Sequence, residues 1–381
     1  MPAPMTEVEP RNATDVAAVR GYAGADGVFY YCLVVLTSVG LLGNALVVLA
    51  VLGERQMRSC SVNRLLANLA VADFSNLLAC LPEWLRSAEN VWPLPAQLCP
   101  WLRWLQVTFL YSSVLTQLCV AVDRYRVVVH PLHVLEMLPR RYNVLLYHGV
   151  WLTALSASVP YFLVNEYVPE DRECKLEGRP SLWLAFKWLE WLLLYALPLV
   201  VITSCYGCVA KQLWASKDDP QKECSESAGP AGAAAWRRSR RERQTVVLML
   251  MACVALYFVC YTPIEVGFVL QQLNVALFFG RTTASLGSLL PNLLVTLCSA
   301  LNPLLYTLFS ANFRRRFSIL LFRMGRTPPP LLPPTFRQDA SRLANLESER
   351  RSQRRTSMPT GQDRQRQSCV QQQRAMTICE A

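Results

Sequence analysis

Apolar residues dominate seven long segments of this chain, and short polar stretches separate them. The first segment, Val28 to Leu52, has about 25 residues, which is too long for the apolar core of a secretory signal. Each of the seven is long enough to form a helix that crosses about 30 Å of hydrocarbon. The other six segments are Leu65–Trp84, Leu98–Val122, Val144–Phe162, Leu182–Leu213, Val246–Leu270 and Leu286–Leu308.

A bilayer offers no water to unpaired backbone groups, so spanning segments must be helices or the strands of a closed barrel. These segments are too long for barrel strands. The pattern therefore predicts an all-α membrane protein with a seven-transmembrane helix bundle over residues 28–310. A composition of 52% hydrophobic and 17% charged residues agrees, because ordinary soluble proteins are less apolar.

The net charge of +11 comes from cations that gather at the turns on one side of the predicted bundle. They do not form one broad binding face, so we expect no nucleic-acid partner. By the positive-inside bias these turns and the carboxyl terminus are cytoplasmic, the amino terminus is extracellular, and the expected location is the plasma membrane. The cations are Arg55, Arg58, Arg64, Arg124, Arg126, Arg140, Arg141, Lys211, Lys217, Lys222, Arg237, Arg238, Arg240, Arg241 and Arg243.

The segments outside the predicted bundle are polar. Residues 1–27 are the expected extracellular amino terminus, where Asn12 begins an Asn-Ala-Thr glycosylation motif. The stretch 216–241 predicts a flexible linker, because its run of small residues at 227–235 has nothing to bury.

After the seventh segment, residues 311–323 alternate apolar and basic positions at helical spacing. This predicts a short amphipathic helix that lies on an anionic membrane surface. Residues 324–381 turn to Pro, Arg, Gln and Ser, a composition typical of a disordered cytoplasmic tail.

Most of the fourteen cysteines lie within apolar segments, where Cys usually packs as a small hydrophobic residue. Cys99 and Cys174 differ because both lie on the predicted extracellular side. An oxidising exterior favours a disulfide between them, and two independent thiols are the alternative. Cys99 and Arg124 are 25 residues apart, about 37 Å of helix, so an outer Cys99 places Arg124 at the inner face.

Polar residues and prolines deep in an apolar helix need a partner, a cavity or a function. This chain carries an ordered set of them, which resembles the signature of rhodopsin-like G-protein-coupled receptors from about Val28 to Arg323. The set is Gly43-Asn44, Leu69-Ala70-Val71-Ala72-Asp73, Asp123-Arg124-Tyr125, Trp151, Pro198 with Tyr206, Cys260-Tyr261-Thr262-Pro263 and Asn302-Pro303-Leu304-Leu305-Tyr306.

The resemblance implies that Asp123 holds Arg124 at rest and that Arg124 faces a heterotrimeric G protein when the receptor is active. An interfacial ion pair without a signalling role is the alternative. Arg243 stands where some relatives carry a restraining acid, and Tyr261 stands where the family usually has Trp. The residues assigned to activation are Asp123, Arg124, Tyr125, Tyr206, Tyr261, Pro263, Asn302, Pro303 and Tyr306.

Asp73 is a carboxylate in a low-dielectric segment, where it needs hydrogen bonds, a proton or a cation. In the family the matching residue coordinates an allosteric sodium ion, and Ser113, Ser299 and Asn302 match other members of that site. Cys298 replaces a more usual Asn or Ser. The alternative is a carboxyl that only ties helices together.

The expected ligand is an extracellular peptide with a positive charge. Retinal is excluded because the seventh segment has no lysine, and amine receptors of the family use an Asp where this chain has Gln106. The outer halves of the helices and the loop after the fourth segment are rich in acids, which suits a cationic ligand. The candidate contacts are Glu83, Gln106, Glu190, Glu265 and Asn292; each glutamate could instead be paired, as Glu190 with Lys187.

Other functions fit the sequence less well. We expect no enzymatic activity, because no phosphate loop and no nucleophile with a base can be found. A transporter would favour repeats and broken helices, which the pattern lacks. A receptor that binds its ligand without activating a G protein stays open. Hydroxyls beside arginines in the tail predict control by receptor kinases and arrestin.

Overall fold

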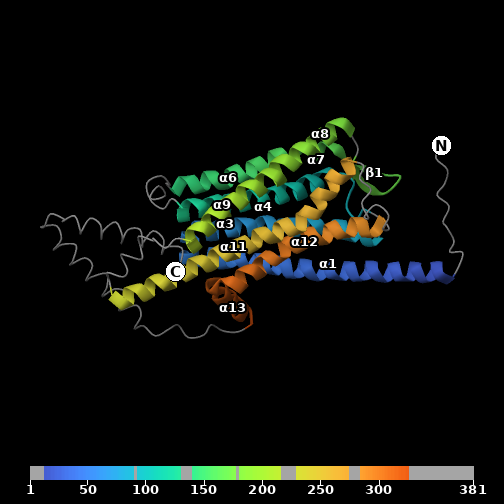
Figure 1. Ribbon diagram of the computed structural model, residues 1–381. Helices are drawn as coiled ribbons and strands as arrows, with labels where there is room; N and C mark the ends of the chain where they lie inside the picture. The colour runs from blue at the N-terminus through green and yellow to red at the C-terminus, as the bar shows by residue number, and fades with distance from the viewer. Residues whose placement is uncertain are drawn as a thin grey trace.

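The computed structural model describes residues 13–89, 92–129, 140–176, 180–215, 229–273 and 284–325. Within them, seven helical segments lie side by side in a bundle (Figure 1). They are α1 (Ala13–Gly53), α3 (Ser61–Glu89), α4 (Leu98–Val129), α6 (Arg140–Ala157) continued by α7 (Val159–Val164), α8 (Pro180–Glu190) continued by α9 (Leu197–Ala210), α11 (Gly229–Gln272) and α12 (Ala284–Phe309). The short α2 (Arg55–Ser59) forms the turn between α1 and α3, and α13 (Ala311–Gly325) follows α12.

Six helices of the described part are long and apolar enough to cross a membrane. Each agrees with one of the predicted segments within seven residues at either end. The apolar stretches are Val28–Gly53, Ser61–Pro82, Leu98–Val129, Ser181–Trp214, Arg240–Leu270 and Leu290–Phe309.

The predicted fourth crossing is divided. Instead of one helix over Val144–Phe162, α6 ends at Ala157 and α7 begins at Val159. Pro160 has no N–H and cannot continue the helical hydrogen-bond ladder. The buried Ser158 at the break bonds the carbonyl of Ala154 at 2.8 Å, and its hydroxyl lies 2.7 Å from that of Thr108 on α4. The break is therefore stabilised by the neighbouring helix.

The predicted fifth crossing is one continuous helical rod from Pro180 to Ala215. Two π-helical stretches interrupt its α-helical geometry: η1 (Trp191–Ala196) and η2 (Lys211–Ala215). The first precedes Pro198, which cannot donate a backbone hydrogen bond. A wider turn before a proline is one way in which a helix absorbs the missing bond.

Two segments predicted as extra-membrane chain are helical in part, and both extend beyond the bundle in Figure 1. Helix α1 begins at Ala13, so residues 13–27 continue the first helix. Helix α11 begins at Gly229, so the prediction of a flexible linker is wrong for residues 229–241. Four of the small residues there are alanines, the best helix formers, and Pro230 sits at the helix start, where its missing N–H does no harm.

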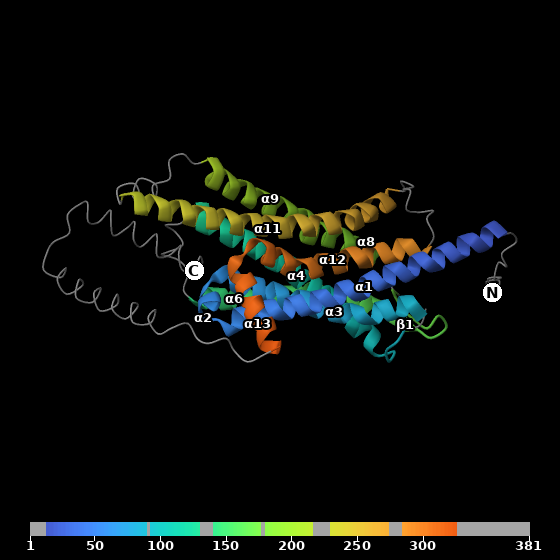
Figure 2. The same ribbon diagram turned by 90° about the horizontal axis from the view of Figure 1, so that it is seen from below.

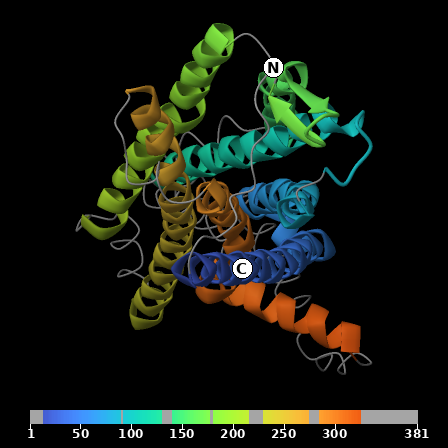
Figure 3. The ribbon, with the colours of Figure 1, turned by 90° about the vertical axis from the view of Figure 1, so that its right-hand side faces the viewer.

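The two ends of the bundle are different. At the hairpin end, β1 (Asn165–Val168) pairs antiparallel with β2 (Glu173–Leu176). At the opposite end, the Arg124 end, α13 runs across the helices rather than along them (Figures 2 and 3). Asn12 and residues 326–381 lie outside the described residues.

The largest buried apolar cluster lies toward the Arg124 end and joins side chains from α1, α3, α4, α9, α11, α12 and α13. Phe313 and Phe317 anchor α13 in it, and the rings of Phe313 and Tyr306 have centroids 5.6 Å apart. Arg316 of α13 also forms an ion pair with Glu54, just before α2. Helix α13 is thus packed onto the bundle through one apolar face.

Helices α1 and α12 approach each other closely because two glycines of α1 lack side chains. A Cβ at Gly40 would lie 2.6 Å from Leu77 Cδ1 and 2.9 Å from Ala300 Cβ, and one at Gly43 would lie 2.9 Å from Pro303 Cβ. Real Cβ atoms are not found at such distances. This contact brings Asn44 of α1 against α12.

Candidate functional site

Asp73 of α3 is buried in the middle of the bundle, with 1% of its surface exposed. Ser113 Oγ of α4 donates to its Oδ1 at 3.0 Å, Ser299 Oγ of α12 to Oδ1 at 3.2 Å, and Asn302 Nδ2 of α12 to Oδ2 at 2.8 Å. The four residues are referred to as the Asp73 cluster. The sequence predicted the same four as a sodium site, and the structure brings them together. Three donors can satisfy a carboxylate that water does not reach.

The Asp73 cluster has oxygen atoms of the kind that hard cations prefer. The buried Asn302 Oδ1 has no hydrogen-bond partner among the described residues, and neither does Asn44 Oδ1. Asn44 Nδ2 donates to the carbonyl of Ser299 at 3.0 Å, so its side chain lies beside the cluster. The donor set therefore fits sodium, although the soft thiol of Cys298 adds no hard ligand.

At the Arg124 end, the Arg124 guanidinium is paired with the residue before it. Nη2 lies 2.7 Å and Nε 3.2 Å from Asp123 Oδ2, and Arg124 is 8% exposed. Ser61 Oγ, at the start of α3, donates to Asp123 Oδ1 at 3.0 Å. Both carboxylate oxygens are therefore engaged, and the ion pair is closed in this structure.

Tyr206 of α9 and Tyr306 of α12 are buried near this end. Their hydroxyl groups have no hydrogen-bond partner among the described residues, and Arg124 is an electrostatic neighbour of Tyr206. Tyr125 is half-buried and packs against the large apolar cluster. A buried hydroxyl without a partner is destabilising, so any rearrangement that provides one is favoured.

Tyr261 and Pro263, two of the residues predicted to act in activation, lie in the last third of α11, and their place is called the hinge position. The ring of Tyr261 is stacked on that of Tyr257, with centroids 4.6 Å apart. One residue further, the Thr262 hydroxyl lies 2.8 Å from that of Tyr195 in η1. Pro263 follows inside the helix, and α11 changes direction over this part in Figure 1. The hinge position is therefore filled by tyrosine in a tyrosine stack.

At the hairpin end, Glu190 of α8 is engaged by two partners. Lys187 Nζ lies 2.7 Å from Glu190 Oε2 and donates to Tyr161 Oη of α7 at 3.0 Å. The Tyr161 hydroxyl lies 2.9 and 3.0 Å from the two carboxylate oxygens of Glu190. These three residues form the Lys187 cluster. Glu190, predicted as a ligand contact, is thus already ion-paired, as the alternative interpretation held.

The other predicted ligand contacts differ in whether the structure brings them near Glu190. Glu265 of α11 is half-buried, and both Lys187 and Glu190 are its electrostatic neighbours. Gln106 of α4 donates to the carbonyl of Ala79 on α3 at 3.0 Å. Asn292 of α12 is half-buried, and the side chain of Glu83 lies outside the described residues. The structure thus joins two of the three glutamates around one lysine.

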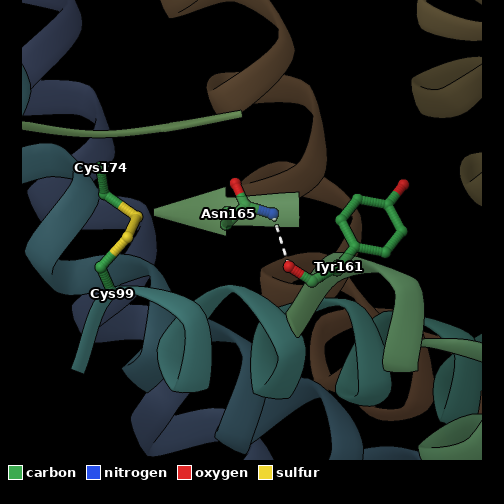
Figure 4. The surroundings of a disulfide bond; sticks show 4 residues. All are labelled: Cys99, Tyr161, Asn165 and Cys174. Carbon is green, nitrogen blue, oxygen red and sulfur yellow. Dashed lines mark hydrogen bonds between the residues drawn. A yellow bond between two sulfur atoms is a disulfide. The ribbon is translucent and has the colours of Figure 1, made fainter. Parts of the chain in front are cut away.

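Cys99 and Cys174 form a disulfide, so the prediction of a bridge is confirmed (Figure 4). It fastens β2 to the start of α4, and β1 continues directly from α7. Asn165 at the start of β1 donates to the carbonyl of Tyr161 at 2.7 Å. The disulfide at β2 is therefore connected to the Lys187 cluster through the two paired strands of the hairpin.

The acidic hairpin is partly neutralised. Lys175 lies 2.7 Å from Asp171 and 3.4 Å from Glu173. The pKa of Lys175 is raised, chiefly by its hydrogen bond to Asp171. Glu166 and Glu170 are exposed. The negative field of the hairpin is therefore weaker than its acid count suggests.

Several structural residues were missed from the sequence. Trp92 is buried against the disulfide, and its backbone N–H bonds the carbonyl of Arg172 at 2.8 Å. Asn68 of α3 accepts from Trp151 Nε1 at 2.9 Å and donates to Thr116 of α4 at 2.8 Å. An asparagine inside a predicted membrane helix was the signal for this second network.

Comparison with known proteins places the chain. Residues 43–306 match the model of the 7 transmembrane receptor (rhodopsin family). Neuropeptide receptor 15 of Caenorhabditis elegans is 37% identical over 78% of this chain and 91% of its own length. The Allatostatin-A receptor of Bombyx mori is 30% identical over 77% and 78%, and the QRFP-like peptide receptor of Branchiostoma floridae is 26% identical over 82% of each chain. The chain is a multi-pass membrane protein that belongs to the rhodopsin family of seven-transmembrane receptors.

Proposed function

We propose that this receptor binds an extracellular peptide through a positive group of that peptide. Three relatives carry a neuropeptide, an allatostatin or a peptide in their names, which supports a peptide ligand. The pair of carboxylates at the hairpin end is the observation that supports a positive charge on the ligand. Among the described residues, Glu190 is paired with Lys187, and both are electrostatic neighbours of Glu265, so two carboxylates share one lysine. A surplus of negative charge in a half-buried place favours a cation.

The ligand is to be identified by screening a peptide library against cells that express the receptor, with arrestin recruitment as the signal. We expect the active peptides to contain Arg, Lys or a free amine that cannot be neutralised. An acidic or lipid agonist would contradict the proposal.

The proposed output is activation of heterotrimeric G proteins through the Arg124 end. The closed Asp123–Arg124 pair and the two buried tyrosine hydroxyls without partners support two arrangements of this end. Ligand-free G-protein activation in cells tests the output. Wild type should exceed Arg124→Ala in G-protein activation at equal surface expression, and equal signals would contradict basal coupling.

The proposed topology puts the hairpin end outside the plasma membrane and the Arg124 end in the cytoplasm. The cations at the turns of the Arg124 end support it through the positive-inside bias. An extracellular amino terminus predicts glycosylation at Asn12. Asn12→Gln should then remove the mobility shift that a glycosidase causes in the wild type.

A sodium ion at the Asp73 cluster is proposed as an allosteric ligand of the resting receptor. The oxygen set and its burial support this assignment. An ion that binds one state preferentially shifts the population toward that state.

Receptor kinases and arrestin are the proposed partners of the tail, which lies outside the described residues. Ser352, Thr356 and Ser357 stand beside arginines, and phosphates there would add charge that arrestin can bind. Truncation after Arg323 should reduce internalisation and leave G-protein activation intact. Unchanged internalisation would count against the tail.

A second candidate function is ligand binding without G-protein activation. The observation that favours it is the Tyr261–Tyr257 stack at the hinge, where the family usually has tryptophan. A peptide that binds the receptor and recruits arrestin, yet gives no G-protein signal in wild type, would support this alternative.

A further inference from the structure

The ammonium of Lys187 is surrounded by groups that bind cations. Glu190 supplies a carboxylate oxygen at 2.7 Å and Tyr161 a phenolic oxygen at 3.0 Å. The ring centroid of Phe268 lies 5.9 Å from Nζ, within the range of cation–π attraction, whereas Tyr161 meets Nζ with its oxygen. A carboxylate flanked by aromatic rings is the environment that a lysine, arginine or amine of a ligand would require.

This site is formed where three helices meet. Tyr161 comes from α7, Lys187 and Glu190 from α8, and Phe268 from α11. The rings of Trp188 on α8 and Phe268 are 5.4 Å apart, so α8 and α11 are in contact here. Glu265 lies three residues before Phe268 and thus on nearly the same face of α11. If the cation moves from the carboxylate on α8 to the one on α11, the interaction between these two helices therefore changes.

The occupant of the site is able to leave it. The Lys187 side chain keeps 27% of its surface exposed and that of Glu190 keeps 14%, so neither is sealed in the core. Lysine has a flexible four-carbon stem and a point charge, without the fixed fork that locks arginine to a carboxylate. Lys187 can turn away from Glu190 while its backbone stays in α8.

We propose that Lys187 is an internal counter-ion that occupies the position of the ligand's cation, and that the ligand displaces it from Glu190. The inference rests on the proposed cationic ligand and adds its mechanism of recognition. In this mechanism the incoming cation bridges Glu190 and Glu265, and Lys187 turns outward. Lys187 then lowers the affinity for every cation, which selects ligands that bring further contacts.

The two members of the ion pair make opposite predictions, which a merely structural pair would not. Lys187→Gln removes the competing cation from the site, so this variant should bind a cation about tenfold more tightly. Tenfold is the lower end of the range of affinities that one charge-assisted contact contributes. Without Glu190 a ligand has lost an anchor, so Glu190→Gln should bind about tenfold more weakly. If the pair were structural, both variants would shift affinity in the same direction.

The experiment uses purified receptor and Nα-acetylated arginine amide as the probe, with Nα-acetylated citrulline amide as its uncharged counterpart; they are called arginine amide and citrulline amide below. Kd values come from the rise of the unfolding temperature with probe concentration. Lys187→Arg keeps the cation but can hold Glu190 with a bidentate fork, so it should be displaced less easily and bind the probe more weakly than wild type. Lys175→Gln removes a paired lysine from the hairpin and should change Kd by less than about threefold. Unfolding temperatures without probe show whether each variant is folded.

The outcomes separate the inference from the proposed function. Opposite shifts in Lys187→Gln and Glu190→Gln, with a weakened Glu265→Gln, support displacement. If arginine amide binds wild type better than citrulline amide does but both pair variants shift the same way, displacement is wrong and the cationic ligand stands. If the two amides bind alike, or no variant binds either, the cationic ligand itself is wrong.

Discussion

The Asp73 cluster and the Lys187 cluster both stabilise a carboxylate within the bundle, but by different means. Asp73 is held by three neutral donors from α4 and α12. Glu190 is held by a cation three residues before it on the same helix and by one tyrosine. The first cluster ties distant helices together, whereas the second is local. Neutral donors can make room for a small ion, while a paired lysine yields only to another cation.

The connection of each cluster to the rest of the fold also differs. The Asp73 cluster lies in the bundle interior, next to the close contact between α1 and α12. The Lys187 cluster depends on α7, a short helix that follows a break and leads into the disulfide-bonded hairpin. We therefore expect changes at the hairpin to affect the Lys187 cluster first.

The largest effect should follow loss of the disulfide. The bridge joins residues 75 apart, and the chain-entropy model assigns such a loop at most about 4.5 kcal/mol. Cys99→Ser, Cys174→Ser and the double variant should each impair surface delivery and, in the receptor that does reach the surface, peptide binding. Surface labelling with a binding assay measures both. Full expression and binding by the double variant would remove the claim.

The inner cluster serves as the control for that experiment. Because the hydrogen bonds of the Asp73 cluster involve no hairpin residue, its sodium response should persist in whatever disulfide-free receptor is recovered. A simultaneous loss of the sodium response would show that the two regions are not independent.

Next in size is the effect of neutralising Glu265. A half-buried charge-assisted contact is worth about 1.5–3 kcal/mol, or about 10- to 150-fold in potency. Glu265→Gln should lose that much for a cationic agonist, whereas Glu170→Gln, an exposed carboxylate of the hairpin, should lose less than about fivefold. Dose–response curves for the two variants provide the matched comparison. Equal losses would mean that Glu265 acts through structure rather than through the ligand's charge.

How well the sequence predicted each region depends on how far apart in the chain its contacting residues lie. The long apolar segments predicted the helices, and Asp73 was recognisable because a carboxylate inside a membrane segment needs partners. The pairing of Glu190 with Lys187 could only be left open, because two residues at helical spacing are free to turn toward each other or toward a pocket. Tyr161 decides between them, and its position depends on the break at Ser158.

The break itself could not be predicted from local pattern. Pro160 in an apolar run is compatible with a kinked helix or a divided one. What stabilises the division is Thr108 and Trp104 of α4, some 50 residues away. The helical start of α11 at Gly229 was missed for the opposite reason, because alanines were read as spacer although they favour helix.

A smaller effect is expected from sodium at the Asp73 cluster. Binding to the resting state alone lowers agonist affinity by the factor 1 + [Na⁺]/Kd, which is about 2 to 11 for concentrations from one to ten times Kd. Asp73→Asn should abolish this dependence, since it removes the charge but keeps the size. Agonist competition binding in sodium and in N-methylglucamine measures it. A wild type that ignores sodium would show that the cluster is structural.

The smallest effect should come from the charges of the hairpin. The Lys175 side chain is 41% exposed beside Asp171 and Glu173, so Lys175→Gln makes the hairpin more acidic without opening a buried core. Exposed charges steer ligands more than they hold them. Association of a cationic peptide should therefore become faster, by less than about threefold at physiological salt, and the dissociation rate should stay unchanged.

The pKa of Lys175 is raised, so its charge is fully present below the usual lysine pKa and is lost only as pH rises through the raised pKa. The contribution of Lys175 to binding should therefore not change between pH 6 and pH 9. Binding kinetics at two salt concentrations and two pH values test all three points. A change in the dissociation rate would mean that the hairpin charges contact the bound ligand, and the contrast between an outer steering region and an inner anchoring region would no longer hold.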